Sequence, residues 1–368
     1  MKHLAAFILL VACAVMALAG QVCTPDPPRP VPLAASAVQG YYVAKPSTQL
    51  ALASSDAAYR LFNPHGDRFT PIGVNHNHWD QSAAYTDLQR TGANTVRIVV
   101  PLPTSQGPAY VQHMLDQFVA QGLLVIPSYW DGTCKADVAP FRAIVDRWVS
   151  MRPTYAKYDA TMLLNIANEW GPGDGATAYV GGKNVYTPNY TWRDENTAAV
   201  LKLRAAGYPN TIVIDAGGCG QNATLVTRDG PAVLAADPLR NVLFDVHVYG
   251  GFHRPATASW MQDYDKAMAA LAASWLPIML GEFGPGRNIG PSPTTVPPED
   301  VIALAESNGW GWLAWAYGDN NLQKCQADDN GFSMTINCGT YTTDTDLTAF
   351  GRTVVPLIKA GAARALLH

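Results

Sequence analysis

The chain has 368 residues, of which 48% are hydrophobic and 15% are charged, and its formal net charge is −4 at pH 7. The mild excess of acidic residues argues against nucleic acid as a partner. The 10 Trp, 16 Tyr and 10 Phe are suited to stacking on apolar ring faces, although most of them are expected in the core.

The N-terminus carries one Lys, an apolar run over residues 4–18 and the small-residue end Ala17-Leu18-Ala19-Gly20. This pattern predicts a secretory signal peptide over residues 1–20 and a secreted or periplasmic protein. The run is shorter than the roughly 20 residues of a membrane span, and no other stretch qualifies. Leu10-Val11-Ala12-Cys13 also fits a lipoprotein signal, which ranks second. Loss of Lys2 with the leader leaves 24 basic against 29 acidic residues.

A proline-rich segment follows the leader. Residues 24–32 contain five prolines, which prevent a helix or a central strand, so residues 21–39 are expected to form an extended linker. Residues 40–368 show no second break of this kind and no internal repeat. We therefore expect one catalytic domain over residues 40–368, a length that accommodates eight strand–helix units.

Beyond the linker, short runs rich in β-branched residues alternate with longer segments of helical period, which predicts a parallel sheet. A doubly wound open sheet would show the same local pattern. Eight units, with polar residues at strand ends and no Gly-rich phosphate turn after the first strand, favour a closed (β/α)8 TIM barrel. The expected strands are residues 70–75, 94–100, 123–129, 161–168, 211–216, 242–249, 277–282 and 309–316, and expected helices include residues 81–91, 110–121, 139–151, 193–206, 257–274 and 298–307.

Polar side chains concentrate at the C-terminal ends of these strands, where barrel enzymes place their reacting groups. Glu169 and Glu282 each follow a strongly apolar strand. A carboxylate in such a place is desolvated unless it is paired, which raises its pKa. Cleavage of a glycosidic bond needs such a pair, one acid to protonate the leaving oxygen and one carboxylate across the anomeric carbon.

Motifs at six of the expected strand ends occur in order along the chain. They are residues 73–78 (GVNHNH), 92–99 (GANTVRIV), 165–170 (NIANEW), 215–221 (DAGGCGQ), 280–284 (LGEFG) and 311–315 (GWLAW). Together they resemble glycoside hydrolase family 5 of clan A, and within it the bacterial β-mannanase branch. The resemblance implies a retaining, double-displacement hydrolase of β-1,4-linked polysaccharide that needs no cofactor and no metal.

The resemblance also implies a role for each matching residue. Glu169 would be the acid/base and Glu282 the nucleophile. Tyr249, by a hydrogen bond, and Arg97, by its charge, would keep Glu282 ionised. Asn168 would bind the sugar 2-hydroxyl group. The other supporting or substrate-binding residues would be His247 beside the acid/base, Trp315 as the stacking floor of the reacting subsite, His76, His78 and Asp131.

The chain departs from this family within the expected substrate groove. It has Tyr129-Trp130-Asp131 where the family often has His-Asp, Cys219 where the mannanase branch tends to have Trp, and Ala316-Tyr317 in place of a second aromatic pair. These changes bear on the substrate more than on the reaction. We expect mannan first, and a cellulose-like glucan second.

Five cysteines remain once Cys13 leaves with the leader, an odd number for an oxidising compartment. Cys325 and Cys338 are close in sequence and could staple a loop. A pairing of Cys134 with Cys219 depends on the barrel. None of the cysteines has the spacing of a zinc site, so no structural metal is expected.

Alternatives accompany these assignments. Glu282 could form a structural ion pair with Arg97, but both glutamates stand at diagnostic strand ends. The rim histidines lack metal-site spacing, so hydrogen-bonded histidines are favoured. A non-hydrolytic, carbohydrate-binding barrel would need aromatic residues but not the full polar set. We expect a monomer. Four tryptophans, Trp79, Trp130, Trp170 and Trp310, could lie in the core or in the groove.

Overall fold

The computed structural model describes residues 40–45, 58–76, 88–100, 107–173, 177–180, 183–186, 192–259, 261–286, 294–318, 331–336 and 341–365. The signal peptide and linker expected over residues 1–39 lie outside these ranges. The same holds for five individual residues of the predictions, which are Cys23, His78, Trp79, Cys325 and Cys338.

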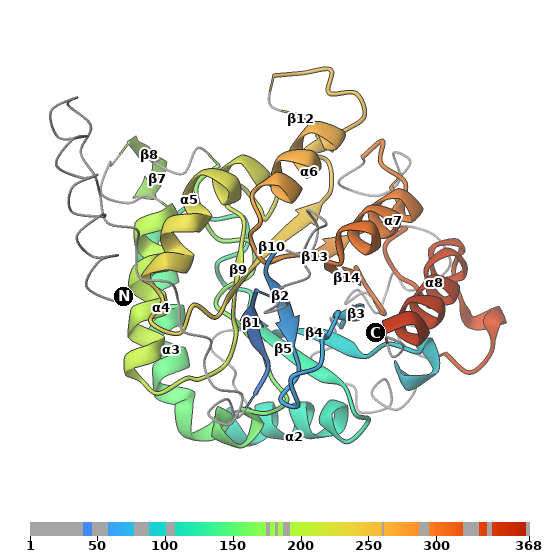
Figure 1. Ribbon diagram of the computed structural model, residues 1–368, viewed down its shortest axis with the longest axis horizontal. Helices are drawn as coiled ribbons and strands as arrows, with labels where there is room; N and C mark the ends of the chain where they lie inside the picture. The colour runs from blue at the N-terminus through green and yellow to red at the C-terminus, as the bar shows by residue number, and fades with distance from the viewer. Residues whose placement is uncertain are drawn as a thin grey trace, which may run out of the picture. The chain divides into compact units, whose positions relative to one another are not determined.

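Eight parallel strands close into a barrel, and their order around it follows their order along the chain (Figure 1). Each of them overlaps one of the expected strands, so the prediction of a TIM barrel is confirmed. The strands are β3 (Ile72–His76), β4 (Thr95–Val100), β5 (Leu124–Tyr129), β6 (Leu164–Asn165), β9 (Ile212–Asp215), β10 (Val242–Val248), β13 (Ile278–Phe283) and β14 (Gly311–Ala314).

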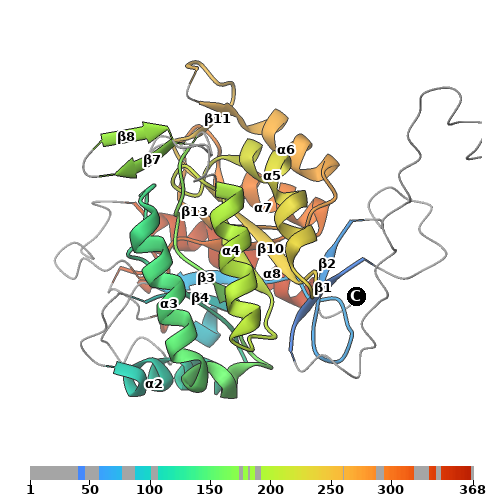
Figure 2. The ribbon, with the colours of Figure 1, turned by 90° about the vertical axis from the view of Figure 1, so that its left-hand side faces the viewer.

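Helices follow the strands on the outside of the barrel, where α4 packs against both α3 and α5 (Figure 2). A helix was expected over residues 81–91, and the described part of that segment forms the 3-10 helix η4 (Leu88–Thr91). The helix expected from residue 257 begins only at Tyr264, because the Asp263 side chain caps it by accepting from the backbone of Lys266 at 3.2 Å. The α-helices are α2 (Gly107–Val119), α3 (Val138–Tyr155), α4 (Trp192–Ala205), α5 (Ala223–Ala236), α6 (Tyr264–Ala273), α7 (Pro298–Asn308) and α8 (Ala349–Ala365).

Two helices, α5 and α8, were not among those expected. Each carries a proline inside, Pro231 in α5 and Pro356 in α8, and an internal proline reads as a helix breaker in sequence. Both helices bury apolar residues in the layer between strands and helices, including Val226 in α5 and Val354 in α8. Packing of an apolar face therefore outweighs the local cost of the proline.

An antiparallel hairpin, β1 (Tyr42–Ala44) with β2 (Arg60–Phe62), closes the N-terminal end of the barrel. Val43 and Leu61 from this hairpin pack with apolar side chains of the barrel interior. The backbone N–H of Val43 donates to Asn241, which directly precedes β10, at 2.8 Å. Apolar side chains therefore fill the N-terminal end of the barrel interior. The polar side chains of the interior lie nearer the C-terminal ends of the strands.

Short pairs of strands extend from two of the loops at those ends. The hairpin of β7 (Thr177–Val180) and β8 (Lys183–Tyr186) follows β6, and β11 (Phe252–His253) pairs with β12 (Gln262–Asp263) after β10 (Figure 2). Two further 3-10 turns are η5 (Ala156–Tyr158) and η6 (Asp344–Asp346). In the described part of the chain, no helix has both the length and the apolar character to span a membrane.

Candidate active site

The register of the barrel aligns polar residues on neighbouring strands. Asn75 on β3 lies opposite Arg97 on β4, and His247 on β10 lies opposite Glu282 on β13. Side chains alternate between the two faces of a strand, so those that point into the barrel form layers. The layer nearest the C-terminal ends is polar and has Arg97 at its centre.

Arg97 is fully buried and makes contacts with five strands or strand ends. Burial alone would lower its pKa, but the carboxylates of Asp215 and Glu282 outweigh burial and raise the pKa, so the guanidinium stays charged. Nη1 donates to Glu282 Oε1 (2.5 Å) and Asn75 Oδ1 (3.1 Å). Nη2 donates to Asn168 Oδ1 (2.6 Å), Asn165 Oδ1 (2.9 Å), Asp215 Oδ2 (3.2 Å) and Ser128 Oγ on β5 (3.4 Å). Nε donates to Asn165 Oδ1 (3.1 Å).

Glu282 is held from two sides. Arg97 donates to its Oε1, and the Tyr249 hydroxyl donates to its Oε2 at 3.1 Å. Burial raises the pKa of Glu282 to about 7, against the opposing charges of His247 and Arg97. Burial and the nearby carboxylates of Glu282 and Glu169 raise the pKa of Tyr249 well above its usual value, so the tyrosine remains a hydrogen-bond donor. Glu282 therefore changes charge near neutrality.

Glu169 follows Asn168 at the end of β6 and is 8% exposed. Its backbone N–H donates to Asp215 Oδ2 at 2.8 Å, and its φ of +50° lies in the left-handed region. Its Oε1 lies 3.0 Å from His247 Nδ1. Carboxylate oxygens of Glu169 and Glu282 and a ring nitrogen of His247 all lie within 4.8 Å of one another. The two glutamates therefore face one shared site.

His247 is buried among four carboxylates. Its Nδ1 lies 3.0 Å from Glu169 and 3.5 Å from Glu282, and its Nε2 lies 3.5 Å from Asp245 and 3.7 Å from Asp215. Burial disfavours the charged ring, but the carboxylates of Glu282 and Asp245 raise the pKa of His247 well above its usual value. Both ring nitrogens therefore face carboxylates, an arrangement that favours the protonated ring.

Asn168 and Trp315 line the same cluster. Asn168 is oriented at both ends of its amide, because Oδ1 accepts from Arg97 and Nδ2 donates to the Thr133 hydroxyl at 2.9 Å. Trp315 packs edge-to-face with Trp130 at a centroid distance of 5.2 Å. It belongs to an apolar cluster that also contains Tyr249. Trp315 thus presents an aromatic wall beside the donor to Glu282.

Two of the predicted supporting residues, His76 and Asp131, have their described contacts outside the pair of glutamates. His76 is on the other face of β3 from Asn75, and its ring packs against Phe118 at a centroid distance of 5.1 Å. Asp131 lies in the turn after β5, where its carbonyl oxygen accepts from Lys135 Nζ at 3.0 Å. Neither side chain contacts Glu169 or Glu282 in the described part of the chain.

The tryptophans divide between core and groove. Trp170 stacks on Phe141 at 3.8 Å and its indole N–H donates to the carbonyl of Asp137, so it is a core residue. Trp310 is buried in the layer between strands and helices. Trp130, half-buried beside Trp315, is the one of the described three that borders the site.

Several polar residues of this site were absent from the expected set, among them Asn165, Asp245 and Thr133. Asn165 accepts a hydrogen bond from Arg97 and donates one to Asp215 Oδ1 at 2.7 Å. A sequence signal for Asn165 exists, because it is an amide within a strand whose neighbouring residues are apolar. Asp245 precedes His247 by two positions, which is the period of a strand. It accepts from the backbone of Gly281 at 2.5 Å. Thr133 lies in a turn, where no periodic pattern marks it.

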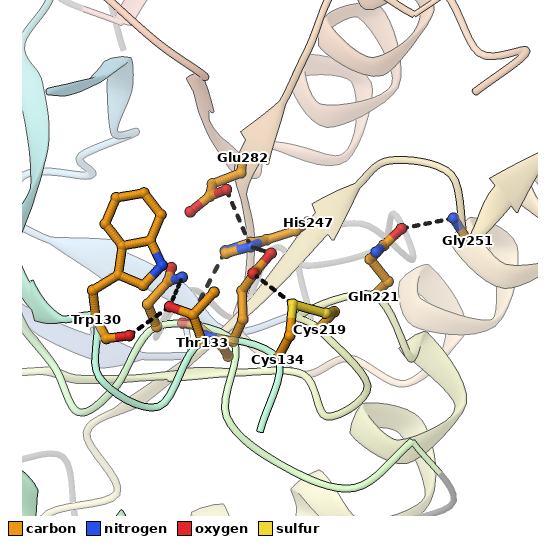
Figure 3. Close-up of a disulfide and its surroundings, with 11 residues drawn as sticks. Trp130, Thr133, Cys134, Cys219, Gln221, His247, Gly251 and Glu282 are labelled. Carbon is orange, nitrogen blue, oxygen red and sulfur yellow. Dashed lines mark hydrogen bonds and ion pairs between the residues drawn. A yellow bond between two sulfur atoms is a disulfide. The ribbon is translucent and has the colours of Figure 1, made fainter. Parts of the chain in front are cut away.

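Cys134 and Cys219 form a disulfide directly beside this cluster (Figure 3). The predicted pairing is therefore present in the structure, and the barrel explains it. The two cysteines follow β5 and β9, the strands on either side of β6, so a separation of 85 residues in sequence becomes a contact in space.

Three groups of residues in the described ranges bring possible metal ligands within 4.8 Å of one another. One contains Cys134 and Cys219, whose oxidised sulfur atoms are not thiolate ligands. The other two contain His247, whose ring nitrogens already lie 3.0 Å from Glu169 and 3.5 Å from Asp245. Arg97 and His247 already supply positive charge to the carboxylates, so the donor set fits a hydrogen-bonded cluster.

A closed (β/α)8 barrel with two glutamates facing each other at its C-terminal end defines a glycoside hydrolase. The family model described as cellulase (glycosyl hydrolase family 5) matches residues 62–321. The chain belongs to this family.

Relatives and solved structures agree with this assignment. The chain is 27% identical to a mannan endo-1,4-beta-mannosidase of Salipaludibacillus agaradhaerens over 72% of this chain and 80% of that protein. It is 30% identical to one of Streptomyces lividans, over 71% of this chain and 65% of that protein. The crystal structure of a β-mannanase from Streptomyces thermolilacinus superposes with a TM-score of 0.65 at 29% identity, covering 85% of this chain and 97% of that one.

The buried charge of Arg97 leads to a prediction about stability. Arg97→Met leaves the carboxylates of Glu282 and Asp215 without their buried cation, which is expected to lower the free energy of unfolding by about 3–5 kcal/mol. Urea denaturation at pH 7 measures the change. Lys202→Met, which removes the same charge from a surface pair with Asp146, should cost less than about 1 kcal/mol. Equal stability of the two variants would contradict the central role of Arg97.

Proposed function

We propose that this protein is a secreted, retaining endo-β-1,4-mannanase. The observation that carries the proposal is the approach of the Glu169 and Glu282 carboxylates to within 4.8 Å around His247. Retaining enzymes separate their carboxyl groups by about 5–5.5 Å, whereas inverting enzymes need about 6.5–9.5 Å to admit a water molecule between them. Mannan is favoured as the substrate by the names of the relatives, which are mannan endo-1,4-beta-mannosidases.

In the first step, Glu282 attacks the anomeric carbon as a carboxylate and forms a glycosyl–enzyme ester. The bond from that carbon to the leaving oxygen breaks, and protonated Glu169 gives its proton to this oxygen. Arg97 and Tyr249 favour the ionised form of Glu282 before attack, since each donates to one carboxylate oxygen. The same two donors stabilise the carboxylate when it leaves.

In the second step, Glu169 is a carboxylate and takes a proton from a water molecule that attacks the same carbon. The ester bond to Glu282 breaks, and the product keeps the β configuration because two inversions have occurred. His247 Nδ1 lies between the two glutamates and donates to Glu169. We assign it the role of holding the acid/base carboxyl in place through both steps.

Asn168 and Trp315 would position the reacting sugar. The amide of Asn168 is fixed by Arg97 and Thr133, which suits a hydrogen bond to the 2-hydroxyl group. The ring of Trp315 lies beside Tyr249, the donor to Glu282, which suits stacking beneath a sugar ring. The roles of His76, His78 and Asp131 in substrate binding stay predictions from the resemblance.

An endo-β-1,4-glucanase is the second candidate, because the matching family model is described as a cellulase. The reaction would be the same and only the sugar would differ. Release of reducing ends from mannan, carboxymethyl cellulose and xylan separates the two. We expect mannan to be cleaved fastest, and a preference for carboxymethyl cellulose would favour the glucanase. Release from none of the three would support a binding protein.

The raised pKa of Glu282 leads to a prediction about pH. The nucleophile must be ionised, so kcat/KM is expected to fall about tenfold per pH unit below a limb near pH 7. Tyr249→Phe removes a donor to the ionised carboxylate, which raises the pKa of Glu282 further and moves this limb to higher pH. A profile of kcat/KM from pH 5 to 9 tests both points. A limb that stays in place in Tyr249→Phe would contradict the role of the tyrosine.

A further inference from the structure

The Cys134–Cys219 disulfide spans the strand that carries Glu169. Cys134 lies in the turn after β5 and Cys219 in the turn after β9, and β6 is the strand between them. Figure 3 shows the disulfide near His247, and the Glu169 carboxyl group contacts both Cys134 and His247. The covalent link therefore joins the two loops that flank the candidate acid/base.

The contact between the disulfide and Glu169 is direct. Cys134 Sγ lies 3.4 Å from Glu169 Oε2, and His247 Nδ1 lies 3.0 Å from Oε1. A disulfide sulfur carries no hydrogen, so it touches Oε2 without donating to it. Among the described residues, no other polar atom lies within hydrogen-bonding distance of Glu169 Oε2. The carboxyl group therefore lies between His247 on one side and the uncharged disulfide on the other.

The backbone around this contact adopts a conformation that needs support. Cys134, Glu169 and Cys219 have φ values of +53°, +50° and +58°, all in the left-handed region that disfavours side chains with a Cβ. Residues in such conformations persist where the surrounding structure over-determines them. The disulfide constrains Cys134 and Cys219 directly, and the loops that carry these cysteines lie beside Glu169.

Hydrogen bonds connect the same three loops in series. The backbone N–H of Gly171 donates to Lys135, and that of Gly218 donates to Gly171, both at 2.9 Å. Gly220, with a φ of +70°, packs so closely on His247 that a Cβ there would lie 2.6 Å from Nδ1. The segment that contains Cys219 thus also supports the donor to Glu169. Movement of this segment would disturb both sides of the carboxyl group.

We propose that the Cys134–Cys219 disulfide is a positioning element for Glu169, and that efficient proton transfer by Glu169 depends on the oxidised state of this pair. The inference rests on the proposed function. A misplacement of about 1 Å at a reacting group can cost roughly 10²-fold in rate. Loss of the disulfide should therefore affect the step that needs the acid, and affect it more than substrate binding.

Leaving groups of different basicity report on this step. A sugar alkoxide leaves only when it is protonated, whereas dinitrophenolate leaves without an acid. For Cys134→Ala/Cys219→Ala we expect kcat/KM on mannotetraose to fall about 10- to 100-fold. On 2,4-dinitrophenyl β-mannobioside it should stay within about threefold of the wild type. The ratio of the two values cancels the fraction of folded enzyme in a sample, so partial misfolding does not imitate the effect.

Reduction of the wild-type protein tests the same idea without mutation. A trialkylphosphine and one water convert the disulfide to two thiols and a phosphine oxide. After the phosphine is removed, exchange with oxidised glutathione re-forms the protein disulfide and releases two molecules of reduced glutathione. The reduced protein should show the shifted ratio and regain the original ratio on reoxidation. The double variant is the matched control: phosphine should not shift its ratio further, which assigns the sensitivity to this pair and not to Cys23, Cys325 or Cys338.

Glu169→Ala separates failure of this inference from failure of the proposed function. If Glu169→Ala shifts the ratio strongly and the double variant keeps the wild-type ratio, the positioning role is wrong and the proposed function stands. An equal loss on both substrates in the double variant would also overturn the positioning role, because it would indicate a general structural effect. If Glu169→Ala itself leaves the ratio unchanged, the acid/base assignment fails and the inference fails with it.

Discussion

Glu282→Ala is expected to lower kcat on mannan by on the order of 10⁵-fold or more, because it removes the carboxylate that forms the covalent intermediate. Glu282 lies within 4.8 Å of Glu169 and is bound by Arg97 and Tyr249, which places one carboxylate where attack is possible. The variant should keep its fold, since Arg97 retains Asp215 as a buried partner. Release of reducing ends measures the activity, and circular dichroism measures the fold.

The stereochemistry of a rescue reaction makes this prediction specific. Azide that enters the space left by the Glu282 carboxylate would attack a dinitrophenyl β-mannoside from the same face, and one inversion gives the α-mannosyl azide. Glu306→Ala is the matched control, because Glu306 lies on α7 and pairs with Arg364 near the surface. It should retain wild-type activity. Substantial mannan hydrolysis by Glu282→Ala would refute the assignment of the nucleophile.

Glu169→Ala has the second largest expected effect. Loss of the acid/base should lower kcat/KM on mannan by about 10²- to 10⁴-fold. The first step on a dinitrophenyl mannoside should be nearly unaffected, because that leaving group needs no proton. The glycosyl–enzyme should then accumulate, since no base activates water for the second step. A burst of dinitrophenolate followed by slow turnover is the expected observation in rapid kinetics.

Azide distinguishes this variant from the first. With Glu282 in place, azide would attack the glycosyl–enzyme from the β face without needing a base, so the product would be the β-mannosyl azide. Turnover of the activated substrate should rise with azide concentration. Formation of the α anomer by Glu169→Ala would mean that the two roles are exchanged between the glutamates.

Much of the fold could be predicted because the strands are marked by local composition. Short runs rich in β-branched residues, such as residues 94–100 and 242–249, mark two strands, and β4 and β10 lie within them. The boundaries of helices were less predictable. Pro231 and Pro356 hide α5 and α8, because their favourable packing against the barrel is a tertiary effect that local propensity does not contain.

The candidate site divides in the same way. Glu169 and Glu282 could be found because a carboxylate directly after an apolar strand stands out from its neighbours. His76 shows the limit of this reasoning: it ends β3 in sequence, but its ring points outward and packs on Phe118. Which face a strand-end residue occupies depends on the register of the closed barrel, and a shift of one residue exchanges the two faces.

The sequence by itself determined the order of the strands, the location of the polar rim and the pair of glutamates, because each is encoded in the period and composition of a short segment. The tertiary structure alone decided how the charges are shared around Arg97 and His247. The tertiary structure also decided that Cys134 contacts Glu169. These two residues are neither adjacent in sequence nor related by the period of a helix or strand. The physical reason is barrel closure, which brings the ends of distant strands to one small ring where buried charges must find partners.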